Sequence, residues 1–361
     1  ITQVSGKHTT DSGAKMNGCS NPLVQKQIDL FPPAPVNYER PDNVEKKITL
    51  FTTDNFPIPA PSLQEAESSM QELENFDGMS LIFSGEWNSR SVYDAKNTER
   101  YININRTGMS ASNYHHWAGR MTCDSNNSPS PIRSWFDRKI KRSVESSKFY
   151  EKSPKTAIAL RKYIAAQFRP TAAMAMYRRF NAVNVYDPCG GWGDRMLAAQ
   201  AMGISYHCRD VNPLVFAGYS GQIAMWGGDI SCEMKGSEVD EPISDYFDLA
   251  FTSPPYWKVE KYQGKDSSHA KFKKCDEWVS GFLKPMIRNT VESLVTGGVI
   301  AINISDCYAN HEYNRLVTPT LEAISERCDL KEIIGYRLPV RSSKKITGIF
   351  CEPIVIGIKK R

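Results

Sequence analysis

A short apolar segment that ends in two consecutive prolines constrains the fold of this chain more than any other feature. Residues 247–252 read Phe-Asp-Leu-Ala-Phe-Thr, which is typical of a buried strand. Ser253 follows, and then Pro254 and Pro255, which cannot continue a β-ladder or a helix. In an open α/β sheet, ligands bind beyond the carboxyl ends of the strands. The stretch from Ser253 to Trp257 therefore has the position of a binding site, although a simple structural turn fits the same residues.

A glycine-rich turn lies upstream, between a predicted strand and a predicted helix. Residues 183–186 read Val-Asn-Val-Tyr, residues 187–195 read Asp-Pro-Cys-Gly-Gly-Trp-Gly-Asp-Arg, and residues 196–202 favour a helix. In this context glycines let the backbone pass close to a ligand, and the start of the helix offers free N–H groups to an anionic group. The turn alone is a weak signal for a nucleoside cofactor.

Two acidic residues strengthen the prediction of a nucleoside cofactor. Asp210 follows the strand-like residues 204–208 and lies twenty-three positions beyond Asp187. A carboxylate at the tip of the second strand is placed to bind ribose hydroxyl groups. Asp229, in the sequence Gly-Gly-Asp-Ile, is predicted to lie where a third strand ends and to accept a hydrogen bond from an adenine amino group.

The rest of the C-terminal part is predicted to complete an α/β sheet. Residues 278–294 have the spacing of an amphipathic helix, and residues 299–304 read as a buried strand. A further helix is predicted near 319–327. The last two strands, at 332–338 and 354–359, are expected to form a hairpin at one edge.

The first 164 residues are predicted to form an N-terminal, partly helical extension. Residues 1–55 are polar and proline-rich and read as an extended arm, whereas 61–76 permits an amphipathic helix. Basic helices are predicted at 132–150 and 154–167. Residues 131–180 contain thirteen Lys or Arg against three Asp or Glu, an excess that suits a phosphate backbone, although a solvated helical face would look the same.

Composition indicates a soluble intracellular protein. The chain of 361 residues is 40% hydrophobic with a net charge of +5, has no run of 18 apolar residues, and does not open with a secretory signal pattern. Its nine cysteines include no C-x-x-C pair, which favours a reduced compartment and argues against a zinc site. His115 and His116 lack a nearby pair of partners, so no metal site is predicted.

These motifs together resemble those of the DNA amino-methyltransferases, which use S-adenosylmethionine to methylate exocyclic nitrogens of cytosine or adenine. The resemblance covers residues 165–361 and rests on the Asp-Pro and glycine turn, Asp210, Asp229 and the Ser-Pro-Pro-Tyr sequence at 253–256. Phe-Arg-Pro at 168–170 resembles the cofactor motif that precedes the first strand in this family. Phage-encoded members are especially similar. The resemblance implies a seven-stranded, Rossmann-like class I methyltransferase sheet as the catalytic domain.

The resemblance also implies a set of site residues. The implied cofactor-binding residues are Phe168, Pro170, Asp187, Cys189, Gly191, Gly193, Asp210 and Asp229. The implied catalytic residues are Ser253, Pro254, Pro255 and Tyr256: Ser253 and the Pro254 carbonyl would accept the amino hydrogens, and Tyr256 would stack on the base. Trp257 would extend the stacking platform. A basic loop is expected to close over nucleic acid through Lys258, Lys261, Lys271, Lys273 and Lys274.

Several substrates remain open at this stage. Ser253 at the first motif position resembles the cytosine-N4 group and favours it over adenine-N6 activity. A target base inside a duplex must be flipped out or presented single-stranded. Target recognition is expected from residues 1–164 and the loop 258–274, because the segment between the motifs has room only for two strands. DNA is the favoured partner over RNA, and an inactive nucleic-acid-binding subunit is the alternative from another class.

Overall fold

The structure is a computed structural model, and it describes most of the chain from residue 56 onward. The described residues are 56–93, 99–126, 128–148, 150–153, 156–158, 164–262, 264, 266–339 and 348–361. The predicted arm at 1–55 lies outside them, as do half of the predicted helix at 154–167 and most of the link between the last two strands.

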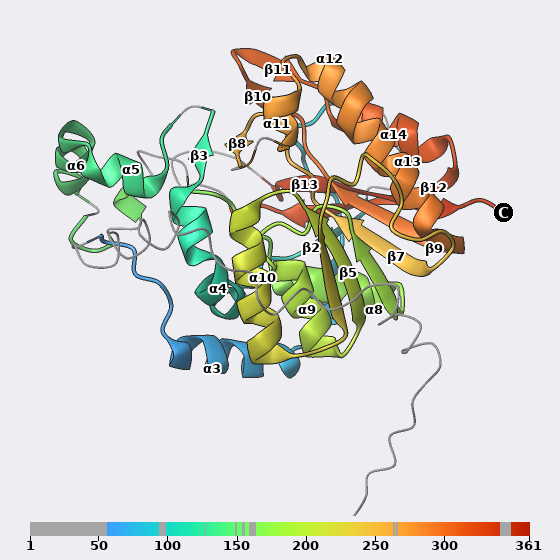
Figure 1. Cartoon of the computed structure of the whole chain (residues 1–361), viewed down its shortest axis with the longest axis horizontal. Coiled ribbons are helices and arrows are strands. Elements are labelled where there is room, and N and C mark those ends of the chain that lie inside the picture. The colour runs from blue at the N-terminus through green and yellow to red at the C-terminus, as the bar shows by residue number, and fades with distance from the viewer. Residues whose placement is uncertain are drawn as a thin grey trace, which may run out of the picture.

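A twisted central sheet organises the described chain (Figure 1). Five of its strands are parallel and adjacent in the order β6, β5, β4, β7, β9, and β13 lies antiparallel between β9 and β12. Their bounds are β4 (Asn184–Asp187), β5 (Ser205–Asp210), β6 (Ile230–Met234), β7 (Phe247–Thr252), β9 (Leu294–Asn303), β12 (Cys328–Arg337) and β13 (Cys351–Lys359). This arrangement confirms the predicted seven-stranded, Rossmann-like class I methyltransferase sheet. β12 pairs antiparallel with β13 as predicted, but the pair does not lie at the edge of the sheet, because two further strands lie beyond β12.

The N-terminal part adds two strands to this sheet, which therefore has nine strands among the described residues. β2 (Arg100–Ile102) pairs parallel with β12, and β1 (Ile82–Ser84) pairs antiparallel with β2. Neither strand was predicted, because three-residue strands carry too little periodicity to be recognised. The N-terminal part is therefore continuous with the central sheet.

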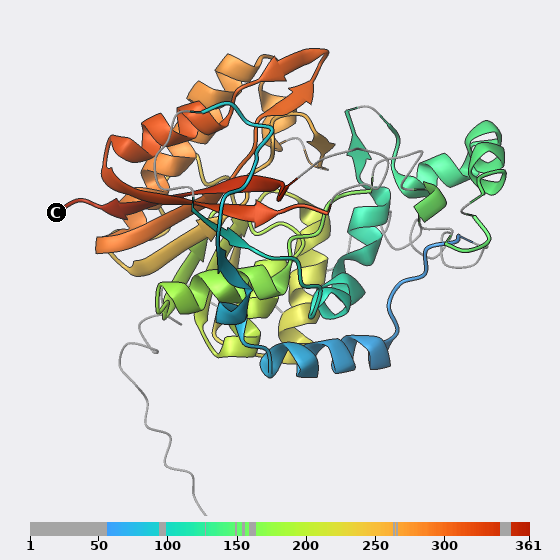
Figure 2. The same cartoon turned by 180° about the vertical axis from the view of Figure 1, so that it is seen from behind.

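Helices cover both faces of the sheet, and the two faces have separate apolar cores (Figures 1 and 2). One layer contains α8 (Pro170–Arg179), α9 (Asp194–Met202) and α10 (Pro213–Trp226). The other contains α12 (Cys275–Trp278), the π-helical turn η2 (Val279–Leu283), α13 (Lys284–Ser293) and α14 (Val317–Ser325). Side chains alternate between the cores, as expected for buried parallel strands: Leu249 packs with the first layer and Ala250 with the second.

The remaining N-terminal elements pack beside the first helix layer and beyond it. α3 (Leu63–Glu74), which confirms the helix predicted at 61–76, contacts α4 (Met109–Thr122) and α9. α5 (Pro131–Phe136) and α6 (Arg138–Glu145) form a lobe that extends away from the sheet, with its own apolar core around Trp117 and Trp135 (Figure 1). The predicted helix at 132–150 is thus two short helices, because Asp137 accepts the Lys139 and Ile140 amides and caps a new helix.

Short elements join the lobe to the loop after the prolines. β3 (Asp124–Ser125) pairs antiparallel with β8 (Glu260–Lys261). The other short elements are η1 (Gly78–Leu81), α11 (Ser268–Lys271), and the hairpin of β10 (Cys307–Ala309) and β11 (Glu312–Asn314). Within the described ranges, none of the helices has the length and apolar character needed to cross a membrane.

Two glycines at the ends of α9 differ in their surroundings. Gly193 precedes the helix with φ +70°, and Gly203 follows it with φ +65°. A Cβ atom on Gly193 would lie 2.4 Å from Gln222 Oε1 and 2.6 Å from His116 Nε2, whereas a Cβ on Gly203 would meet nothing within 4 Å. Only Gly193 is therefore required for close packing.

We predict that Gly193→Ala lowers the free energy of unfolding more than Gly203→Ala does. Both substitutions force a left-handed backbone on alanine, at a cost of about 1–2 kcal/mol. Gly193→Ala also brings the methyl group against Gln222 and His116. Urea unfolding of the two variants separates the contributions, and equal losses would show that the packing around Gly193 relaxes freely.

Candidate active site

A cavity lies beyond the carboxyl ends of the parallel strands. It encloses about 600 Å³ of space outside the protein atoms, part of it open to solvent. Five of the predicted site residues line it: Cys189, Gly191, Asp210, Ser253 and Pro255. The structure thus brings the glycine turn, the second-strand carboxylate and the proline motif to one place.

The Asp210 carboxylate connects two loops at the floor of the cavity. Its Oδ2 accepts the Gly191 amide at 2.9 Å, and its Oδ1 accepts the Asn212 amide at 2.9 Å. Burial raises its pKa to about 6, and the two amides oppose that rise. Each carboxylate oxygen has a further lone pair, so Asp210 can still accept a hydrogen bond from a hydroxyl group of a ligand in the cavity.

Asp187 lies beneath the glycine turn and does not line the cavity. Its carboxylate is fully buried and bonded to Arg195, with Nε to Oδ2 at 2.6 Å and Nη2 to Oδ1 at 3.3 Å. Tyr206 donates to the same Oδ2 at 2.6 Å. Arg195 also donates to the Cys189 carbonyl at 2.6 Å. The structure therefore corrects the predicted role: Asp187 fixes the shape of the turn through Arg195.

Gly193, Phe168 and Pro170 also stand outside the lining of the cavity. Gly193 serves the packing of α9. Phe168 stacks on Tyr336 with centroids 4.7 Å apart and planes 7° from parallel, and Pro170 is the buried first residue of α8. The structure therefore gives these three residues packing roles outside the cavity. A sequence motif alone does not distinguish such a role from direct contact with the cofactor.

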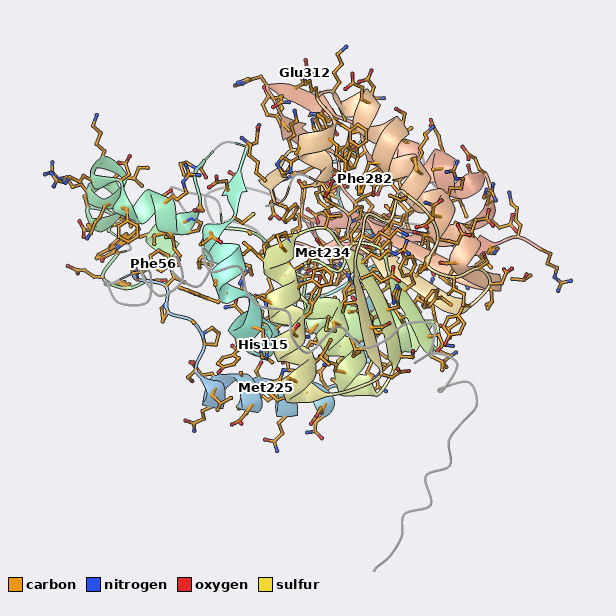
Figure 3. All side chains as sticks on the ribbon, in the orientation of Figure 1. Phe56, His115, Met225, Met234, Phe282 and Glu312 are labelled. Carbon is orange, nitrogen blue, oxygen red and sulfur yellow. The ribbon has the colours of Figure 1, made fainter. Side chains whose placement is uncertain are left out.

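The predicted position of Asp229 is wrong. α10 continues to Trp226 and β6 begins at Ile230, so Asp229 lies at the amino end of its strand, and its carbonyl accepts the Tyr206 amide at 2.9 Å. The cavity is at the opposite end of the sheet. There, the residues that line it after β6 are Lys235, Gly236, Ser237 and Glu238. Figure 3 labels Met234, which ends β6, and Phe282, which lines the cavity from η2.

The proline motif is joined to two later strands by a polar network. Ser253 Oγ lies 3.4 Å from Asn303 Oδ1, and the Tyr256 hydroxyl lies 3.2 Å from the same atom. Tyr256 is also 3.1 Å from Glu352 Oε2. Burial, followed by the charge of Glu352, raises the pKa of Tyr256 well above its usual range. Pro254 is buried, and Pro255 lines the cavity.

Trp257 does not form the predicted stacking platform. Its side chain is 1% exposed and packs edge-on against Trp278, with ring centroids 6.1 Å apart. The residue has φ +50°, and its amide donates to the Pro255 carbonyl at 3.1 Å. This tight turn directs the indole into the core behind the motif.

The basic loop after the motif covers one side of the cavity. Tyr262, Ser267 and Ser268 line the cavity from this loop. Lys271 forms an ion pair with Glu238 at 2.8 Å, and Lys258 donates to the Lys273 carbonyl at 3.1 Å. The side chains of Lys261, Lys271, Lys273 and Lys274 are exposed, and their predicted contact with nucleic acid stays a prediction.

The sequence analysis missed several residues of the site. Asn303 ends the buried strand β9, so its position was available from the strand pattern in principle. Glu352 could not be found in that way, because it begins an antiparallel strand and reaches the site only through the register of β12, β13 and β9. Lys235, Ser237 and Glu238 follow β6, whose carboxyl end was wrongly predicted to lie at Asp229.

Comparison with known proteins gives no close relative. No family model matches the chain, and no curated protein matches its sequence. Among solved structures, TrmN from Thermus thermophilus matches with 15% identity and a TM-score of 0.39 over 54% of this chain and 49% of that chain, about half its length. An rRNA methylase from Streptococcus thermophilus matches with 15% identity and a TM-score of 0.34, over 55% of this chain and 100% of that chain.

A third match is 1,6-didemethyltoxoflavin-N1-methyltransferase from Burkholderia thailandensis, whose structure contains bound S-adenosylhomocysteine. The identity is 15% and the TM-score is 0.35, with coverage of 52% of this chain and 77% of that chain. Independently of these matches, the observed strand order and the glycine turn after β4 define a Rossmann-like class I methyltransferase fold.

We predict that Asp187→Asn lowers the free energy of unfolding by about 3–5 kcal/mol, because it leaves the buried Arg195 guanidinium without its counter-charge. Asp248→Asn is the matched control. Asp248 forms no ion pair in the described structure. Its carboxylate accepts hydrogen bonds from the Val183 and Asn184 amides at 2.9 and 2.8 Å, and the side-chain oxygen of asparagine can accept the same bonds. Chemical denaturation compares the two variants. Similar losses would contradict the structural role of the Asp187–Arg195 pair.

Proposed function

We propose that this protein transfers a methyl group from S-adenosylmethionine to an exocyclic amino group of a DNA base, with cytosine N4 as the favoured target. The observation that supports this proposal most directly is that Asp210 and Ser253 line one cavity. One is a carboxylate suited to ribose hydroxyl groups, and the other is a hydroxyl suited to an amine.

The residues of the cavity fit the proposed cofactor. Gly191 has no side chain, so its backbone lines the cavity directly, and the Asp210 carboxylate beside it has lone pairs that can accept hydrogen bonds. Ser237 and Glu238 provide further polar groups at the end of β6, and Phe282 and Val215 supply apolar surface. S-adenosylmethionine would supply an electrophilic methyl group on a sulfonium centre.

The proline motif fits the needs of an amine nucleophile. The lone pair of an exocyclic amine is delocalised into the base ring, so it must be localised before it can attack. Ser253 and the Pro254 carbonyl would accept the two amino hydrogens and favour a tetrahedral nitrogen. Because prolines fix the backbone on both sides of this carbonyl, the acceptors are oriented before the reaction, as electrostatic preorganisation requires.

Adenine N6 presents the same amino group and is the nearest alternative substrate. An RNA base would also fit acceptors of this kind. A catalytically inactive nucleic-acid-binding subunit fits less well, because Asp210, Gly191 and Ser253 are all in place around one cavity.

We predict that the protein methylates DNA and that Ser253→Ala lowers kcat by about 100-fold or more, as expected when a preorganised polar contact is removed from a transition state. The assay incubates the protein with methyl-labelled S-adenosylmethionine and DNA or RNA, followed by digestion and mass spectrometry of the nucleosides. Ser244→Ala, at an exposed position outside the cavity, is the matched control and should retain activity.

N4-methylcytosine is the expected product of this assay. N6-methyladenine would move the assignment to the adenine alternative, and label found only in RNA would contradict DNA as the substrate. Full activity of Ser253→Ala would show that the proline motif is structural. Cofactor affinity, measured by calorimetry, should change little in that variant.

The lobe formed by α5 and α6 supports a nucleic-acid substrate. Arg138, Lys139 and Arg142 are exposed on α6, and none of them forms an ion pair within the described residues. The lobe projects from the body of the protein (Figure 1). Exposed cations of this kind neutralise phosphates and release counterions, which gives salt-dependent affinity.

We predict that Arg138→Glu with Arg142→Glu weakens nucleic-acid binding and makes its dependence on salt concentration less steep. The magnitude of the slope of log K against log salt should fall by about 0.9 for each duplex phosphate contact that is lost. Arg288→Glu is the control, because Arg288 is also exposed but lies on α13 in the other helix layer. Fluorescence anisotropy over a salt series makes the measurement. Equal slopes for the double variant and the wild type would exclude α6 from the interface.

A further inference from the structure

The side-chain amide of Asn303 has a fixed orientation next to the proline motif. Asn303 is the last residue of β9 and is 1% exposed. Its Nδ2 donates to the Pro353 carbonyl at 3.2 Å. The flipped amide would set Oδ1 against that carbonyl, with two acceptors in contact, so the orientation is determined. Oδ1 consequently faces Ser253 and Tyr256.

This orientation decides the direction of the Ser253 hydroxyl hydrogen. A serine hydroxyl can donate or accept, and it rotates to suit its neighbours. Ser253 Oγ lies 3.4 Å from Asn303 Oδ1, which can only accept. The contact is long, as is common for active-site hydrogen bonds before the substrate binds. With its hydrogen directed at Asn303, Ser253 presents lone pairs to the cavity.

Tyr256 competes with Ser253 for the same acceptor. Its hydroxyl has one hydrogen and three acceptors within reach: Glu352 Oε2 at 3.1 Å, Asn303 Oδ1 at 3.2 Å and the Asn303 carbonyl at 3.4 Å. A hydrogen bond to an ionised carboxylate is stronger than one to a neutral amide. Ionised Glu352 therefore takes the Tyr256 hydrogen and leaves Asn303 Oδ1 to Ser253.

The surroundings of Glu352 combine burial with two cations. Glu352 is in β13 opposite Tyr336 of β12, and the charges of Arg169 and Arg90 act on its carboxylate. Burial raises the pKa of Glu352 above its ordinary value of 4.5, while the hydrogen bond from Tyr256 and then the two arginines oppose this rise. Arg169 is held by the Tyr336 hydroxyl, to which its Nε donates at 2.8 Å.

We infer that Asn303 and Glu352 are positioning residues that make Ser253 a hydrogen-bond acceptor and so select an amino group as the methyl acceptor. This inference rests on the proposed function. An amino group of cytosine or adenine can donate to Ser253. A keto oxygen at the same ring position, as in thymine or uracil, would place two acceptors together, and an unmade hydrogen bond of that kind is a strong basis for discrimination.

The test compares the wild type with Asn303→Leu and Glu352→Gln in the methyl-transfer assay, with cofactor affinity measured by calorimetry. Asn303→Leu removes the acceptor and lets Ser253 donate, so kcat should fall about tenfold or more, the effect of one lost hydrogen bond in the transition state. The affinity for S-adenosylmethionine should stay within about twofold, since Asn303 does not line the cofactor cavity.

Glu352→Gln keeps the shape of the side chain and tests the role of its charge. Because the ionised form is the one that orients Tyr256, wild-type kcat should rise as pH increases through the raised pKa of Glu352. In Glu352→Gln the part of the acid limb that Glu352 causes should be absent, and kcat should be low throughout. Asp210 and Asp194, whose pKa values burial raises to about 6, are unchanged in the variant, so any acid limb that they cause should be the same in both proteins.

The outcomes separate this inference from the proposed function. If the wild type methylates an amino nitrogen while Asn303→Leu keeps wild-type kcat, or Glu352→Gln keeps the pH profile of the wild type unchanged, the inference is overturned and the proposed function stands. If the wild type transfers no methyl group to any amine, the proposed function is overturned, and the inference with it. Because Glu352→Gln preserves side-chain volume, it decides the question even where Asn303→Leu destabilises the buried end of β9.

Discussion

The buried ion pair between Asp187 and Arg195 is the interaction on which the geometry of the site depends. Arg195 belongs to the first turn of α9, Asp187 ends β4, and the guanidinium also holds the Cys189 carbonyl between them. The pair therefore closes the glycine turn from below. With the turn in this conformation, the Gly191 amide donates to the Asp210 carboxylate. This hydrogen bond connects the loop after β4 to the end of β5 at the base of the cavity. A buried pair of this kind contributes little net stability but makes alternative turn conformations costly, because each would leave a charge unpaired.

Local sequence patterns predicted the order of the elements and the edge of the sheet at which the site lies. Proline, glycine and acidic residues at the ends of apolar runs are local signals, and three residues singled out in this way, Asp210, Ser253 and Gly191, line one cavity. The wrong predictions concerned the direction of a strand or of a side chain. Asp229 was assigned to the wrong end of β6, since a polar residue next to a short apolar run does not reveal whether the strand begins or ends there. Trp257 was predicted to extend the stacking platform because sequence cannot show that φ +50° directs its side chain inward.

Other parts of the site could not be predicted from sequence because they depend on pairing over long distances along the chain. Glu352 reaches Tyr256 only through the antiparallel placement of β13 beside β9, and Asn303 is oriented by a carbonyl of that same strand. β2 likewise joins the sheet only by pairing with β12, and β1 joins it only by pairing with β2. The register of such pairs is a property of the three-dimensional structure and cannot be read from local sequence patterns.

The two-residue ladder between β3 and β8 has a mechanical consequence. Beyond the ladder itself, the Asn126 amide donates to the Val259 carbonyl at 3.2 Å, and the Ala166 amide donates to Glu260 Oε1 at 2.9 Å. These bonds link the loop that carries Tyr262 and Ser267 to the cavity with the residues that precede and follow the lobe in the sequence. The loop and the lobe are therefore connected through these bonds. A ligand in the cavity and a ligand on the lobe that act through this connection share one coupling free energy. By thermodynamic linkage, each changes the affinity for the other by the same factor.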